Sequence, residues 1–335
     1  MLVRFIVHHV YLIDWLCLFI PCLLIFVGWF MRRRHRRWAV ALTAFAFLAL
    51  LTYSYGRFYV SQQLVVRRVT FTSADLPEAF DGYRIVQFSD VHVGSMTGHR
   101  KDFLRRVVDS INAQRADAVV FTGDLLNSSF TEVEPHRQVL SAVKASDGVF
   151  SVLGNHDYAE YMDQSDPAAV NEQLGRSRAI HAELGWHLLC NSWYKLSRDS
   201  ASIFLAGMEN DGQGRFPQLG DHNMALQGLS RSDFVVMLEH DPTSWHRRLL
   251  PHTHVQLTLS GHTHGGQFAI LGWSPASLRY PECGGMYYAG NRALNVSTGV
   301  GGVIPFRLGV PGEIVVITLV KGKLPNSSTP ELLNY

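Results

Sequence analysis

Two long apolar runs near the N-terminal end, separated by a cluster of arginines, constrain this chain more than any other feature. The first run covers residues 10–31 and the second covers residues 38–58. About 20 apolar residues suffice for a helix to cross a bilayer, and each run reaches that length. A cleaved signal peptide carries its positive charge ahead of the apolar region, whereas here the charge lies between two runs. We therefore predict a retained two-helix transmembrane hairpin over residues 1–60.

The arginine cluster, residues 32–37, also predicts how the hairpin is oriented. Short loops rich in Arg and Lys stay in the cytoplasm, so both ends of the hairpin would face the other side. The prediction is a multi-pass protein of the cell (inner) membrane, with its catalytic part on the periplasmic or extracellular side. The alternative, a nucleic-acid or nuclear-localisation patch, is disfavoured by the apolar flanks. We expect no nucleic acid as a specific partner, since the net charge is only +2. Asp14, within the first run, is expected at the membrane interface.

The cysteines give no disulfide framework. Cys17 and Cys22 lie in the first apolar run, and Cys190 and Cys283 are isolated from each other in the sequence. We expect free thiols, with a Cys190–Cys283 bridge as the alternative, and no structural zinc.

Beyond residue 61 the pattern changes to alternating strands and helices. Strands are expected at residues 84–88, 118–121 and 149–153, with helices over residues 100–113 and 139–143 between them. This is the pattern of a parallel sheet with crossover helices. In such sheets the functional groups gather beyond the carboxyl ends of the strands.

The flanking segments carry weaker signals. Residues 64–71 are expected to form a hairpin or an edge strand, and residues 321–335 a mobile tail. One catalytic domain would then cover residues 61–320. In its second half, a helix is expected at residues 168–185 and a loop insertion at residues 210–232. Strands are expected at residues 186–189, 203–207, 234–238, 255–259, 269–271, 285–288, 293–296 and 314–319.

Five short segments place metal-ligand side chains at tight turns, four of them directly after a run rich in Val, Ile, Leu or Phe. Each segment alone is weak, because Asp-x-His and Gly-Asp are usually ordinary turns. Together they supply enough His, Asp and Asn side chains for two metal ions. This mixed ligand set suits Mn, Fe or Zn better than Ca, and Mg remains possible. The segments are Asp90-Val91-His92, Gly123-Asp124, Gly154-Asn155-His156-Asp157, His240 and Gly261-His262-Thr263-His264.

The residue types predict different roles for these side chains in metal binding and proton transfer. An extended strand end would point Asp90 and His92 to one side, toward one ion. Asp124 follows a glycine, so its carboxylate can approach and bridge two ions. Two ions about 3.5–4 Å apart clamp a phosphate and lower the pKa of a bridging water, whose hydroxide becomes the nucleophile. His156 fits the acid that protonates the leaving group, with Asp157 orienting its imidazole.

The motif series resembles that of the calcineurin-like metallophosphoesterase family over residues 84–319. That resemblance implies an α/β fold, a four-layer α/β/β/α sandwich with two facing mixed sheets, here preceded by the transmembrane hairpin. It implies that His156 contacts the phosphate or the leaving group. It also implies two metal-ligand sets that share one aspartate, namely Asp90, His92, Asp124 and His264 for the first ion and Asp124, Asn155, His240 and His262 for the second.

Finer features resemble the membrane-linked YkuE/YaeI branch of that family. They are Gly-His-Thr-His-Gly-Gly-Gln at residues 261–267, Gly-Gly-Met-Tyr at 284–287 and Val-Ser-Thr-Gly-Val-Gly at 296–301. The branch includes phosphodiesterases, and one bacterial member cleaves UDP-2,3-diacylglucosamine in lipid A synthesis. One departure is Leu125-Leu126-Asn127, where an acidic residue is common. It puts substrate contacts in doubt and not metal binding.

Substrate contacts are predicted near the last metal motif, because arginine pairs well with phosphate oxygens. The candidates are Arg279, Tyr280 and Arg307, with Tyr287 and Tyr288 as further aromatic residues.

The sequence thus favours a membrane-anchored, two-metal phosphoesterase of the phosphodiesterase or pyrophosphatase type. Its substrate would be a phosphate ester, lipid-linked or derived from the cell envelope, and the bilayer would be its partner. One alternative is a UDP-2,3-diacylglucosamine pyrophosphatase of lipid A biosynthesis. The predicted topology counts against it, since that substrate is made on the cytoplasmic side. The other alternative is a non-catalytic membrane scaffold, which would usually have lost ligands, and none is lost here.

Overall fold

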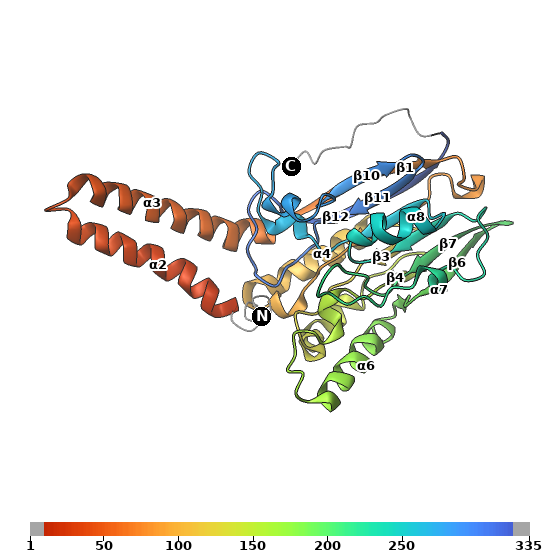
Figure 1. Ribbon diagram of the computed structural model, residues 1–335, viewed down its shortest axis with the longest axis horizontal. Coiled ribbons are helices and arrows are strands. Elements are labelled where there is room, and N and C mark those ends of the chain that lie inside the picture. Colours follow the sequence, from red (N-terminus) through yellow and green to blue (C-terminus); the bar gives the residue numbers. More distant parts are fainter. Residues whose placement is uncertain (1–9, 324–335) are drawn as a thin grey trace.

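The protein is seen in a computed structural model whose described residues are 10–323, so residues 1–9 of the predicted hairpin lie outside them. It shows a helical hairpin projecting from an α/β domain (Figure 1). Residues 324–335, most of the predicted tail, lie outside the described residues. Residue 321 belongs to a strand.

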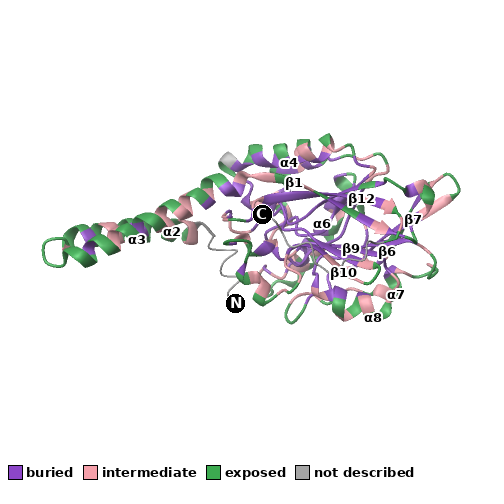
Figure 2. Ribbon diagram, turned by 90° about the horizontal axis from the view of Figure 1, so that it is seen from above, coloured by how far each residue is buried: buried purple, intermediate pink, exposed green. Residues whose placement is uncertain are grey.

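The hairpin consists of α2 (Val10–Met31) and α3 (Arg36–Ser54), which lie side by side in Figure 1 with the arginine-rich turn at the far tip. A π-helical turn (Tyr55–Tyr59) and a 3-10 turn (Val60–Gln62) extend α3 toward the domain. Residues 12–31 and 36–62 are long and apolar enough to cross a membrane. Their large apolar side chains, such as Phe30 and Trp38, are exposed, as expected for a surface that meets lipid. In Figure 2 much of both helices has the colour of exposed residues.

One polar network joins the two helices of the hairpin. The Asp14 carboxylate forms an ion pair with Arg57 (Oδ1 to Nε, 2.9 Å) and accepts a hydrogen bond from the Tyr53 hydroxyl. A charged group in an apolar segment is costly unless it is paired. Asp14 therefore has a partner on the other helix, a contact that the sequence analysis did not foresee.

Two mixed sheets of six strands form the centre of the domain. The first sheet has the order β1 (Leu64–Ser73), β12 (Gly312–Lys321), β2 (Arg84–Phe88), β3 (Ala118–Phe121), β4 (Val149–Ser151) and β5 (His187–Leu188). The second has the order β10 (Gly285–Ala289), β11 (Arg292–Val296), β9 (Leu257–Ser260), β8 (Val235–Leu238), β7 (Ala201–Gly207) and β6 (Ser192–Arg198).

The sheets pack face to face and helices cover their outer faces (Figure 2). Successive residues of β2 are buried on opposite faces of the first sheet. Val86 packs against the outer helices, whereas Ile85 packs between the two sheets. Strands buried on both faces read as continuous apolar runs, which is why the sequence located β2, β3 and β4. The outer helices are α4 (Lys101–Ala113), α5 (Arg137–Leu140) and α6 (Pro167–Glu183) on the first sheet, and α7 (His222–Ala225) and α8 (Leu250–His252) on the second.

This arrangement confirms the four-layer α/β/β/α prediction and corrects three details. Residues 64–71 belong to one edge strand, β1, and not to a hairpin. Strand β6 was missed because its residues are largely exposed and polar. Residues 269–271 form no strand, since Leu271 has φ 51° and turns the chain back. All four cysteines are free.

The strand register places the end of the hairpin beside the carboxyl end of β2. Strand β1 begins directly after the hairpin and runs parallel to β12, with Leu64 opposite Gly312. Strand β12 runs antiparallel to β2, with Val315 opposite Gln87. The chain therefore leaves the hairpin at the sheet edge where β2 ends, and where the first metal motif begins.

Candidate metal centre

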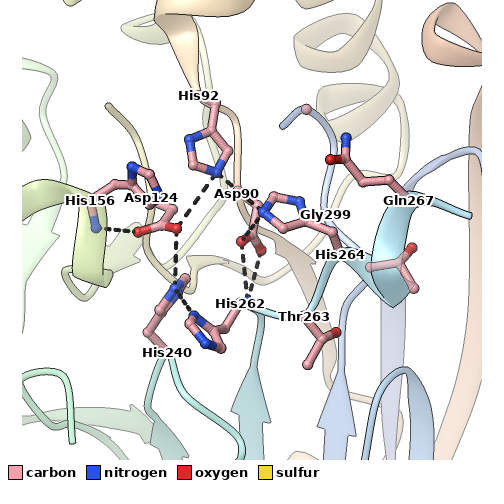
Figure 3. A network of polar contacts seen from close by, with 12 residues as sticks. Asp90, His92, Asp124, His156, His240, His262, Thr263, His264, Gln267 and Gly299 are labelled. Carbon is pink, nitrogen blue, oxygen red and sulfur yellow. Dashed lines mark hydrogen bonds and ion pairs between the residues drawn. The ribbon is translucent and has the colours of Figure 1, made fainter. Parts of the chain in front are cut away.

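The predicted metal-ligand residues meet where the two sheets present the carboxyl ends of their strands (Figure 3). The first sheet supplies the segments that follow β2, β3 and β4, and the second sheet supplies those that follow β8 and β9. The side chains that come together are Asp90, His92, Asp124, Asn155, His240, His262 and His264.

Four of these residues form one compact group. Asp90, His92, Asp124 and His264 each offer a ligand atom within 4.8 Å of the others. His92 Nε2 lies 3.5 Å from Asp124 Oδ2, and His264 Nε2 lies 3.4 Å from Asp90 Oδ1. These atoms could hold one metal ion.

A second group shares the same aspartate oxygen. His240 Nε2 lies 3.3 Å from Asp124 Oδ2 and 3.3 Å from His262 Nδ1. His262 Nδ1 in turn lies 2.8 Å from Asn155 Oδ1. Asp124 Oδ2 therefore faces both groups, as a bridging ligand requires.

Backbone carbonyls fix the orientation of the imidazole rings. His92 Nδ1 lies 3.0 Å from the Leu126 carbonyl, and His240 Nδ1 lies 2.7 Å from the Thr122 carbonyl. A carbonyl only accepts, so each Nδ1 carries the proton and donates, which directs Nε2 of each ring at the site. Metal-binding histidines are commonly oriented in this way.

Two of the candidate ligand histidines, His92 and His264, are held in the neutral form that binds a cation. Burial lowers the pKa of His92 to about 3, so its ring is neutral at pH 7. Burial likewise holds the pKa of His264 well below its usual range. Their Nε2 atoms face each other at 3.3 Å, so nitrogen lone pairs and carboxylates converge on one point. Such a donor set fits a divalent ion of the Mn, Fe or Zn type.

The loops that carry the ligands have an unusual backbone. Asp90, His92, Asp124, His262 and His264 have φ angles of 53°, 48°, 62°, 72° and 54°. Residues other than glycine rarely adopt this left-handed region, and such strain concentrates at functional sites. The expected extended end after β2 is therefore wrong, because left-handed turns direct these side chains into the site.

Two glycines allow the ligands to approach the backbone closely. A Cβ atom at Gly154 would lie 2.2 Å from Asp124 Oδ1, and one at Gly261 would lie 2.4 Å from Asp90 Oδ2. Any side chain at either position would displace a ligand carboxylate.

Asp157 has a different role from the one predicted. Its carboxylate accepts hydrogen bonds from the backbone N–H groups of Asp124, Leu125, Leu126 and Gly154, at 2.9–3.1 Å. His156 instead donates Nδ1–H to the Asn127 carbonyl at 2.7 Å and stacks on Tyr161. Asp157 thus holds the loop that carries Asp124, and the Asn127 carbonyl orients His156.

Only some of the predicted substrate residues lie at the candidate metal centre. Tyr280 lies at the site, with its hydroxyl 3.0 Å from His262 Nε2, and Arg279 beside it is exposed. Arg307 is buried and donates to the carbonyls of Thr298, Gly299, Gly301, Val310 and Pro311. A guanidinium committed to these carbonyls supports the loop and is not a substrate contact. The Tyr287 hydroxyl donates to the Gly284 carbonyl.

Sequence reasoning missed Asp241. Its carboxylate is buried, and Oδ2 lies 3.6 Å from His262 Nε2. A carboxylate behind a metal-binding imidazole orients the ring and raises its basicity. Its position directly after His240 was the available signal.

Comparison with known proteins agrees with this site. Residues 83–266, more than half of the chain, match the family model described as calcineurin-like phosphoesterase. The protein belongs to this family of metallophosphoesterases, as the motif series predicted.

Two similar proteins illustrate the membership. The chain is 31% identical over 291 residues to the metallophosphoesterase YkuE of Bacillus subtilis, covering 83% of this chain and 93% of that protein. It is also 31% identical over 293 residues to the transmembrane protein with metallophosphoesterase domain of Danio rerio, covering 85% of this chain and 63% of that protein. A third relative, UDP-2,3-diacylglucosamine pyrophosphatase LpxG of Chlamydia trachomatis, is 27% identical over 302 residues, covering 75% and 88%.

The position of Asp157 yields a prediction about stability. Asp157→Asn places an amide NH₂ against backbone N–H groups, each of which costs about 1–3 kcal/mol when left without an acceptor. We expect a clear fall in the melting temperature of the detergent-solubilised protein, together with loss of metal. The matched control is Asp166→Asn at the exposed N-cap of α6, where asparagine caps equally well. A variant that melts like the wild type and is only slower would instead support the predicted contact with His156.

Proposed function

We propose that this protein is a membrane-anchored hydrolase of phosphate diesters or pyrophosphates that uses two divalent metal ions. The observation that carries the proposal is the position of Asp124 Oδ2, 3.5 Å from His92 Nε2 and 3.3 Å from His240 Nε2. Two bound ions would supply positive charge that polarises the phosphoryl oxygen and acidifies a water molecule. Asp90, His92, Asp124 and His264 would hold one ion, and Asp124, Asn155, His240 and His262 the other.

His156 is the proposed proton donor to the leaving group. Its backbone N–H donates to Asp124 Oδ1 at 2.8 Å, which fixes it at the edge of the site. Its Nδ1–H bond to the Asn127 carbonyl persists when the ring is protonated. Nε2–H is then available to a leaving oxygen, as general acid catalysis requires.

The hairpin supports a membrane-bound setting. Two helices long and apolar enough to span a bilayer precede the catalytic part, for which we propose residues 61–320. A relative from Danio rerio is itself named a transmembrane protein. By the positive-inside rule, the arginines at the hairpin tip favour a cytoplasmic tip. The catalytic part would then face the periplasm or the cell exterior and act on envelope or lipid-linked phosphate esters.

A second candidate is hydrolysis of UDP-2,3-diacylglucosamine. The similarity to LpxG favours it, and a bilayer anchor suits a lipid substrate. The arginine-rich tip counts against it, because this substrate is made on the cytoplasmic side.

Substitutions in the site separate metal binding from proton transfer. Asp124→Asn should remove at least one ion and abolish turnover of bis-p-nitrophenyl phosphate, as measured by metal analysis and absorbance. His156→Ala should keep both ions and slow turnover about 10²–10⁴-fold for substrates whose leaving group needs a proton. The loss should be smaller for the nitrophenyl diester than for a phenyl diester, because nitrophenolate leaves without a proton. His246→Asn, at an exposed histidine paired with Glu282, is the control. An Asp124→Asn protein that stays fully loaded and active would refute the ligand assignment.

A substrate panel separates the two candidate functions. The wild-type enzyme with Mn²⁺ is given bis-p-nitrophenyl phosphate, p-nitrophenyl phosphate and UDP-2,3-diacylglucosamine, and protease is added to spheroplasts in parallel. We expect preference for the diester and trimming of the catalytic part from outside. Faster cleavage of the nucleotide lipid, with the catalytic part protected from protease, would establish the second candidate instead.

A further inference from the structure

A short surface segment next to the metal motif carries large apolar side chains that nothing in the described structure covers. We call residues 268–278 the apolar loop. Leu271 and Leu278 are 102% and 81% exposed, and Ile270 and Trp273 are more than half exposed. Single exposed apolar residues are common on protein surfaces, but four within nine residues mark a contact surface.

The tip of the apolar loop is a well-defined turn. The backbone N–H of Ile270 donates to the Trp273 carbonyl, and that of Trp273 donates to the Ile270 carbonyl, both at 3.0 Å. Leu271 and Gly272 occupy the tip with φ angles of 51° and 78°. Left-handed turn positions facing water favour glycine or asparagine. A leucine at this position is unfavourable, because leucine rarely adopts a positive φ and its apolar side chain is exposed to water. Burial of this side chain in an apolar environment would offset that cost.

The apolar loop lies on the side of the domain that meets the hairpin. Gln267, just before the loop, donates through Nε2 to the carbonyls of Ile304 and Phe306. The Phe306 ring stacks on Tyr53 of α3, with ring centroids 5.3 Å apart. Figure 1 shows the light-blue segment that includes the loop at the end of the domain where α3 joins it. A bilayer that holds the hairpin would therefore face this loop.

The two candidate ligands next to this loop are the least buried of the set. His262 and His264 are partly exposed, whereas the other proposed ligands are buried. Both belong to the segment that continues into the apolar loop. The Phe216 ring meets His262 edge-on, and the exposed Arg215 and Arg279 lie beside Phe216 and Tyr280. Aromatic rings and arginines thus lie next to the partly exposed His262.

We propose that the apolar loop inserts into the outer part of the bilayer that holds the hairpin, so that the metal centre opens at the level of the lipid headgroups. The substrate class is then an amphiphile that stays in the membrane, with its phosphate ester at the metal centre and its acyl chains in the bilayer. Arg215 and Arg279 meet the anionic headgroup. Trp273 suits the interface and the aliphatic residues suit the acyl region. This inference rests on the proposed membrane anchoring.

A bilayer fits this surface better than a protein partner does. The loop is on the same side as the end of the apolar hairpin, and the exposed Arg279 follows it directly, as at contacts with anionic lipids. Whether the tip of the apolar loop lies in lipid or in water can be measured independently of catalysis.

The test places an environment-sensitive NBD probe at the tip of the apolar loop. Leu271→Cys is labelled in full-length protein whose four native cysteines are replaced by alanine, and is reconstituted in phosphatidylcholine/phosphatidylglycerol vesicles. Met224→Cys is the matched control, because Met224 is an exposed apolar residue on α7, at the end of the domain away from the hairpin (Figure 1). We expect blue-shifted emission and quenching by spin-labelled lipid at position 271 only. Water-like emission at both positions would overturn the proposal, as would a tip shielded from water but not quenched by lipid.

A second readout tests the substrate class. A diacylglycerol p-nitrophenyl phosphate diester in vesicles is compared with bis-p-nitrophenyl phosphate in solution, since both release nitrophenolate. Leu271→Asp should lower the ratio of lipid to soluble turnover at least tenfold, and Met224→Asp should leave it unchanged. An unchanged ratio for Leu271→Asp would overturn the substrate proposal. If the wild type cleaves neither substrate, the hydrolytic function fails, and the probe at position 271 still decides whether the loop inserts.

Discussion

The buried Asp124 carboxylate is the interaction on which the rest of the site depends. Oδ1 accepts the backbone N–H of His156, and Oδ2 faces His92 and His240. One side chain thereby joins segments that follow β2, β3 and β4 of one sheet with the segment that follows β8 of the other. Burial raises the pKa of this carboxyl, but the charge of His240, followed by that of His156, outweighs burial and holds the pKa well below its usual range. A permanently ionised carboxylate at the junction of the sheets is suited to a metal bridge.

Contacts from the surrounding residues offset the backbone strain at Asp124. The left-handed backbone at Asp124 persists because Asp157 accepts the N–H groups of that loop, and because Gly154 lets the carboxylate lie against the backbone. The same strand ends lie beside the junction with the hairpin, since β1 starts where β2 ends. The fold thus brings the candidate metal centre and the apolar hairpin to one end of the domain.

The residue pattern located the central strands for physical reasons, whereas the four-layer arrangement was implied by the family resemblance. Strands β2, β3 and β4 are buried on both faces, so apolar runs marked them, and the ligand motifs stood at their ends. Exposed β6 lacked such a signal. The partners of Asp157 and Arg307 could not be predicted, because both bind backbone groups whose positions depend on the packed loops. The exposure of Leu271 depends in the same way on a tertiary turn, since its residue type alone suggested a strand.

The most direct test of the central claim is anomalous diffraction from crystals of the protein grown with Mn²⁺. A two-metal centre should give two anomalous peaks about 3.5–4 Å apart, one beside His92 and His264 and the other beside His240 and His262, with Asp124 between them. A single peak that Asp124 does not contact, or metal bound only elsewhere in the domain, would contradict it.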